Sequence, residues 1–66
     1  RERLQEGLEM LQANLKAAVV LRDVQGLTNE EAAEILKLSV SSLKARLHRG
    51  RVLLRKHMQL YLQPSR

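Results

Sequence analysis

Apolar residues recur at helical spacing through the first part of the chain and predict two helices. In the first, over about residues 2–12, apolar side chains fall three or four residues apart in a stripe formed by Leu4, Leu8, Leu11 and Leu15. The second is predicted over about residues 15–25, with Asn14 as its N-cap. Its expected apolar face comprises Ala17, Val20, Leu21 and Val24. Gly26 then follows, where a helix end favours a left-handed residue.

A capping signal marks the start of a third predicted helix, over about residues 29–37. Thr28 is followed three residues later by Glu31, so the hydroxyl and the carboxylate can each accept a hydrogen bond from a backbone N–H that the helix leaves free. Ala32 and Ala33 are small, which would let another helix approach closely.

The fourth predicted helix is the longest and begins after Ser39, its expected N-cap. Its expected buried stripe consists of Leu43, Leu47, Gly50, Leu54, Met58 and Tyr61. Pro64 cannot continue a helix, so residues 62–66 are expected to form a frayed tail. The whole chain, residues 1–66, is therefore predicted to be one all-α domain of four helices.

Composition agrees with a helical fold. The chain has 66 residues, with 14 leucines and one aromatic residue, whereas a sheet would favour Val, Ile, Tyr and Phe. It contains no cysteine, so neither a disulfide nor a thiolate metal site can stabilise it. Because it begins at Arg1 rather than at Met, we expect it to be part of a longer protein.

The same sequence disfavours several classes of protein. It shows no nucleophile–base pair, no metal-ligand cluster and no glycine-rich phosphate loop, so we expect neither an enzyme nor a bound cofactor or metal. No apolar run approaches the roughly 18–20 residues that span a bilayer. The first ten residues lack the apolar core of a signal peptide. We therefore expect a cytoplasmic protein without a membrane partner.

Charge is distributed unevenly along the chain, whose net charge is +5. Residues 1–38 hold five basic and seven acidic side chains, a balance of −2, whereas residues 39–66 hold seven basic and none acidic, a balance of +7. Such segregation indicates an anionic partner, either nucleic acid or a membrane surface. A merely solvated face would mix both signs, and a membrane-bound helix would carry Trp or Phe, which are absent here. Nucleic acid is the favoured partner.

The third and fourth predicted helices together have the pattern of a helix-turn-helix, over about residues 29–56. A short capped helix is joined to a longer basic helix by a three-residue turn around Leu38. Leu36, Leu38 and Leu43 are expected to hold the two helices together. The basic helix begins with small polar residues, so its N-terminal turns can enter a major groove about 12 Å wide.

The stretch LKAAVVLRDVQGLTNEEAAEILKLSVSSLKARLHRGRVLLRK resembles region 4 of bacterial sigma factors, particularly the small extracytoplasmic-function type. The resemblance covers about residues 11–56 without gaps and is carried by LRDVQGLT, EEAAEIL and KARLHRGR. It implies that the fourth helix recognises double-stranded promoter DNA at the −35 element within RNA polymerase holoenzyme. It also implies two protein partners, the flap of the polymerase β subunit and an anti-sigma factor.

The resemblance further implies which residues contact DNA. The positions that face the major groove are matched by Lys44, Ala45, His48 and Arg49. Positions at or near phosphates are matched by Ser41, Ser42, Arg46 and Arg51, and an arginine that reaches the DNA backbone from the second helix is matched by Arg22. Lys37 departs from the family, in which Gly is common at this place in the turn.

Two alternatives stay open at this point. The helix-turn-helix of a response-regulator-type activator has a similar pattern, usually with an added dimerising helix. A protein-interaction module that binds an anti-sigma factor or the polymerase flap would belong to a different functional class. Separately, the neighbouring Arg22 and Asp23 are interpreted, for Asp23 in particular, as an ordinary exposed pair that contributes little stability.

Overall fold

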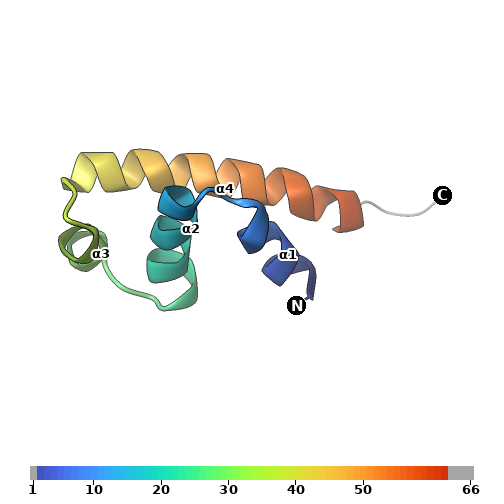
Figure 1. Ribbon diagram of the computed structural model, residues 1–66, viewed down its shortest axis with the longest axis horizontal. Coiled ribbons are helices and arrows are strands. Elements are labelled where there is room, and N and C mark those ends of the chain that lie inside the picture. Colours follow the sequence, from blue (N-terminus) through green and yellow to red (C-terminus); the bar gives the residue numbers. More distant parts are fainter. Residues whose placement is uncertain (1, 63–66) are drawn as a thin grey trace.

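The computed structural model describes residues 2–62, and the side chains of residues 2–60. Its elements are α1 (Glu2–Met10), α2 (Ala13–Val19), the π-helical turn η1 (Val20–Val24), α3 (Asn29–Leu36) and α4 (Val40–Leu62). α4 is a long rod, and the shorter elements all lie along one side of it (Figure 1). Over the described residues, the predicted all-α class with four α-helices is confirmed. Leu62, expected in the tail, is still helical, and residues 63–66, including Pro64, lie outside the described part.

The core lies between α4 and the shorter elements. The buried hydrophobic residues of the described part are Leu8, Leu11, Leu15, Ala18, Val19, Ala32, Ala33, Leu43 and Leu47. Of the predicted α4 stripe, Leu43, Leu47 and Gly50 are buried, and Leu54 and Met58 are half-buried. The side chain of Tyr61 lies outside the described side chains.

α2 and η1 form one continuous helix whose last turn is wider than an α-turn. The N–H of Gln25 donates to the carbonyl of Val20, five residues back, at 2.9 Å, which is the spacing of a π-turn. Gly26 follows with φ of +75°, so the predicted left-handed residue at this helix end is confirmed. The N–H of Leu27 then donates to the carbonyl of Leu21 at 3.0 Å and closes the end of the helix.

The start of α2 differs from the prediction. The helix begins at Ala13, and its N-cap is Gln12 rather than Asn14; the Gln12 side chain makes no capping hydrogen bond. Leu11, which directly follows α1, is buried in the core. The chain therefore turns there, and α2 begins before Asn14, its predicted N-cap.

Two predicted apolar faces are also partly wrong. Leu4 is 39% exposed and Val24 is 58% exposed, whereas α2 buries Leu15, Ala18 and Val19. Residues 17–21 are apolar without interruption, so their periodicity cannot select one face of the helix. Contact with α4 selects it instead.

Local hydrogen bonds cap the starts of α3 and α4. The predicted capping box is confirmed, because the N–H of Glu31 donates to Thr28 Oγ1 at 3.1 Å and the N–H of Thr28 donates to Glu31 Oε1 at 2.8 Å. Ser39 caps α4 as predicted, since its Oγ accepts from the N–H of Ser42 at 3.1 Å. Lys37 adopts the left-handed conformation, with φ of 58°, which glycine adopts more readily than lysine.

α2 lies directly against the backbone of α4 at Gly50. A Cβ added there would lie 2.7 Å from Cγ2 of Val19 and 3.3 Å from the carbonyl oxygen of Leu15. The first distance is shorter than side chains tolerate, and the second involves backbone, which cannot rotate away. Gly50 is therefore required by the helix crossing.

We expect Gly50→Ala to lower the free energy of unfolding by about 1–2 kcal/mol, because overpacking outweighs the higher helix propensity of Ala. Chemical denaturation followed by circular dichroism measures this change. Val19→Ala removes the methyl group that a new Cβ would meet, so the double variant should lose less than the sum of the two single losses. A stabilising Gly50→Ala would contradict this account of the crossing.

Candidate nucleic-acid interface

The first turns of α4 present the residues predicted to face a major groove. Lys44, Ala45, His48 and Arg49 are all exposed, whereas Leu43 and Leu47 beside them are buried. At about 100° per residue, the four exposed positions fall on the side of the helix that faces away from the core. The fold therefore brings them together on one surface, which we call the basic face (Lys44, Ala45, His48, Arg49).

The residues of α4 predicted to contact phosphates differ in their exposure. Ser41 and Ser42 are exposed in the first turn, where helix N–H groups favour an anion. Arg46 is half-buried and lies about 160° around the helix from His48 but only about 60° from Arg49, on the flank between the basic face and the core. Arg46 therefore borders the basic face at Arg49 and is less exposed than its members.

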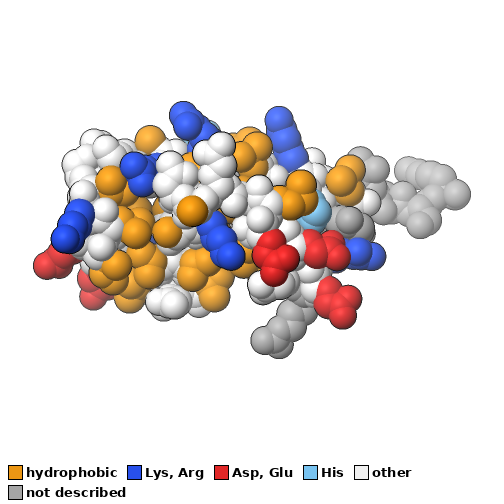
Figure 2. Space-filling model, in the orientation of Figure 1, with side chains coloured by type: hydrophobic (Ala, Val, Ile, Leu, Met, Phe, Trp, Pro, Cys, Tyr) orange, Lys and Arg blue, Asp and Glu red, His pale blue; other side chains and the backbone are white. Residues whose placement is uncertain are grey.

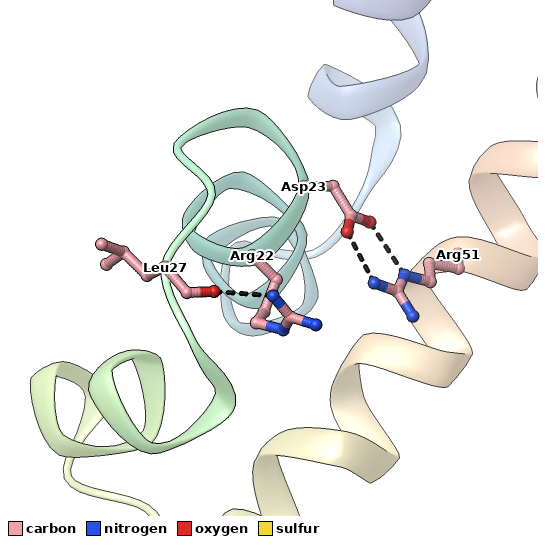
Figure 3. A network of polar contacts seen from close by, with 4 residues as sticks. All are labelled: Arg22, Asp23, Leu27 and Arg51. Carbon is pink, nitrogen blue, oxygen red and sulfur yellow. Dashed lines mark hydrogen bonds and ion pairs between the residues drawn. The ribbon is translucent and has the colours of Figure 1, made fainter.

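Arg51 is engaged by an acidic partner. Its Nε donates to Oδ2 of Asp23 at 2.8 Å, and its Nη2 donates to Oδ1 at 2.6 Å (Figure 3). These hydrogen bonds hold the pKa of the Asp23 carboxyl below its usual value and raise the pKa of Arg51. The interpretation of Asp23 as one of an ordinary exposed pair with Arg22 is wrong, because its carboxylate is bound by an arginine 28 residues later in the chain.

Arg22 is also used inside the domain. Its Nη1 donates to the carbonyl oxygen of Leu27 at 2.6 Å, which ties η1 to the loop before α3 (Figure 3). The side chain is half-buried, and its Nε is buried without a hydrogen-bond partner in the described part. Two of the arginines predicted to contact the DNA backbone, Arg22 and Arg51, are therefore held by intramolecular contacts.

The basic face itself is not neutralised. Within the described part of the chain, no hydrogen bond or ion pair of the side chain engages Lys44, His48 or Arg49. Figure 2 shows Lys and Arg side chains projecting along the edge formed by α4, whereas the acidic side chains in view lie over α1 and at the end of the molecule near α3, with other basic side chains beside them. The acidic side chains visible on this face thus lie away from the edge formed by α4.

Among residues 2–62, no three His, Cys, Asp or Glu side chains come together as a metal site would require. No helix in this range is both long enough and apolar enough to cross a bilayer.

Comparison with known proteins identifies the family. The sequence model described as "Sigma-70, region 4" matches residues 1–54. The chain belongs to the sigma-70 region 4 family. The resemblance to this family is confirmed, and the family match extends further toward the N-terminus than about residue 11, where the resemblance was placed.

Named relatives point the same way. The chain is 40% identical over 55 residues to the ECF RNA polymerase sigma factor SigE of Mycolicibacterium smegmatis, an alignment that covers 83% of this chain and 21% of SigE. It is 40% identical over 53 residues to the ECF RNA polymerase sigma factor SigX of Bacillus subtilis, with 80% and 27% covered. It is also 40% identical over 57 residues to the RNA polymerase sigma factor YlaC of the same organism, with 86% and 33% covered. The region 4 domain thus aligns with about a fifth to a third of the length of these relatives.

Sequence reasoning missed the role of Asp23. The carboxylate and its arginine lie 28 residues apart and on different elements, so no local spacing rule connects them. The nearest signal is that Asp23 is the only acidic residue between residues 10 and 29, but that observation does not indicate a partner.

The Asp23–Arg51 pair predicts an acid-dependent contribution to stability. Both side chains are well exposed, at 36% and 42%, so Asp23→Asn should lower the free energy of unfolding by less than about 1 kcal/mol at neutral pH. A carboxyl whose pKa is lowered in the folded state stabilises the fold above its unfolded pKa of about 4, and this stabilisation is lost as the pH falls below that value. The difference between wild type and variant should therefore shrink as the pH falls below about 4.

Urea denaturation across this pH range measures the effect. Glu34→Gln, which removes an exposed carboxylate from α3, is the matched control and should show no such convergence. A difference between wild type and Asp23→Asn that is independent of pH would contradict the ion pair as its cause.

Proposed function

We propose that this domain binds the promoter −35 element as part of an RNA polymerase sigma factor and so directs transcription initiation. The observation that carries the proposal is the unneutralised basic face on the first turns of α4, in a chain that belongs to the sigma-70 region 4 family. α3 and the capped turn after it form the first part of a helix-turn-helix, over about residues 29–56, and α4 is its recognition helix. The role is cytoplasmic and requires no catalysis by the domain.

In the proposed complex, the first turns of α4 enter the major groove and the basic face reads base edges. Arg49 can donate two hydrogen bonds to a guanine, Lys44 can donate to guanine acceptors, and the Ala45 methyl can contact a thymine methyl. His48 lies between them on the same surface. These side chains differ in the base edges they suit, so together they can select a sequence.

Contacts to phosphate would orient the helix in the groove. Ser41 and Ser42 at the start of α4, and Arg46 on its flank, are the proposed backbone contacts, supported by the exposure of the two serines. Arg22 and Arg51 match backbone-contacting positions of the family as well. To reach a phosphate, Arg22 would first have to release the carbonyl of Leu27, and Arg51 the carboxylate of Asp23.

A second proposal concerns protein partners, namely the flap of the polymerase β subunit and an anti-sigma factor. Val24 of η1 and Ile35 of α3 are each 58% exposed, although both are large apolar residues. Figure 2 shows hydrophobic side chains gathered below α4 on the side of α2 and α3. Exposed apolar surface of this kind favours a protein partner, and Val24 and Ile35 belong to other elements than α4, which carries the basic face. Binding of DNA and of a protein partner are therefore compatible.

We expect Arg49→Ala to weaken binding to the preferred promoter duplex by about 1–3 kcal/mol and to relax preference at one base pair, because a base-reading arginine is lost. Arg55→Ala, further along α4, is the matched control and should weaken binding slightly and equally for all sequences. Leu47→Ala should instead reduce stability by about 2–5 kcal/mol through lost burial and a cavity. Promoter-selection assays paired with thermal melts distinguish these effects. If Arg55→Ala rather than Arg49→Ala changed the preference, the proposed placement of α4 would be wrong.

Duplex binding should also depend strongly on salt. If the domain meets about four to six phosphates, the logarithm of the binding constant should fall with the logarithm of salt concentration at a slope of roughly −4 to −5. Fluorescence anisotropy with a labelled duplex measures this slope. A response independent of salt would contradict the proposal that the basic face serves a nucleic-acid partner.

A further inference from the structure

Arg51 lies in one row with cationic residues of the recognition helix. Lys44, His48, Arg51 and Arg55 are spaced by four, three and four residues, so they follow one another along a single side of α4. At 1.5 Å per residue, Arg51 is roughly 10 Å beyond Lys44 along the helix axis. It is thus placed where an arginine could meet a phosphate once the first turns of α4 occupy the groove.

Asp23 binds this arginine through both of its carboxylate oxygens. Both carboxylate oxygens accept a hydrogen bond from the guanidinium, at 2.6 and 2.8 Å, and the two residues come from different elements, η1 and α4 (Figure 3). A bidentate pair of this kind is directional as well as electrostatic. Arg51 in the pair offers little net charge to a phosphate, in contrast with Lys44 and Arg49, which have no such partner in the described part.

We propose that Asp23 limits sequence-independent DNA affinity, because it keeps the Arg51 guanidinium bound to η1 and away from the phosphate backbone in the DNA complex. This inference rests on the proposed function, DNA binding by α4. Phosphate contacts strengthen binding to every duplex, whereas base contacts discriminate between them. Withholding one cation therefore weakens binding to all duplexes alike and leaves the base-reading residues unchanged.

The experiment measures duplex binding by the full chain between 50 and 200 mM salt for wild type, Asp23→Asn, Arg51→Gln and the double variant. Asp23→Asn should bind both promoter and unrelated duplexes more tightly. The slope of the logarithm of its binding constant against the logarithm of salt concentration should be steeper by about 0.9, the value for one added phosphate contact. Its gain over wild type should then be about 3.5-fold larger at 50 mM than at 200 mM salt. Arg51→Gln should keep the wild-type slope, and the gain from Asp23→Asn should vanish in the double variant.

Glu34→Gln changes the net charge by the same amount and is the matched control. Any gain it produces acts through the general field of the protein, so that gain should persist when Arg51 is also changed to Gln. Circular dichroism melts establish that each variant is folded at the assay temperature. The Arg51→Gln slope tests the inference independently, even if Asp23→Asn does not fold.

Two results would overturn the inference. A salt-dependence slope for Arg51→Gln that is shallower than the wild-type slope by about 0.9, the value for one phosphate contact, would mean that Arg51 leaves Asp23 and contacts DNA. A gain from Asp23→Asn that survives in the double variant would mean that Arg51 is not the group being withheld. If either result is obtained while Arg49→Ala still relaxes the promoter preference, it contradicts this inference alone. A wild-type chain that binds no duplex contradicts both the proposed function and this inference.

Discussion

At Gly50 the backbone of α4 lies directly against Leu15 and Val19 of α2, without room for a side chain between them. This contact sets the rotation of α2 about its own axis. Asp23 follows Val19 by four residues, about one helical turn, and Arg51 follows Gly50 directly. The crossing therefore also brings the carboxylate of η1 to the guanidinium of α4, and the ion pair forms beside the contact at Gly50.

The same packing decides which side of α4 remains available. Leu43, Leu47 and Gly50 are buried against the shorter elements, so the opposite side of the helix faces solvent along its length. Ala32 and Ala33 of α3 are buried in one cluster with Leu43 and Leu47 of α4, and Lys37 takes up the left-handed conformation in the turn between the two helices. The first turns of α4 are thereby presented at one end of the molecule (Figure 1), and the residues of the basic face are exposed there.

Three arginines of this domain illustrate how one residue type serves different purposes. Arg49 is exposed without a partner in the described part, Arg51 is bound by a carboxylate, and Arg22 donates to a backbone carbonyl. Their contributions to DNA binding should differ accordingly, because a guanidinium already engaged gains less from a phosphate than one that is merely hydrated. The resemblance to the family implies DNA contacts for all three and does not separate them.

Much of the fold could be predicted because its signals are local. The Thr28–Glu31 capping box, the Ser39 cap and the left-handed Gly26 each depend on neighbours within a few residues, and each was found in the structure. The stripe of α4 and the basic face follow from helical periodicity and from the absence of acidic residues after position 38. The start of α2, its buried side and the partner of Asp23 could not be predicted in this way. Residues 17–21 are apolar on every side, and 28 residues separate Asp23 from Arg51, so only the packing of α2 on α4 decides which groups meet.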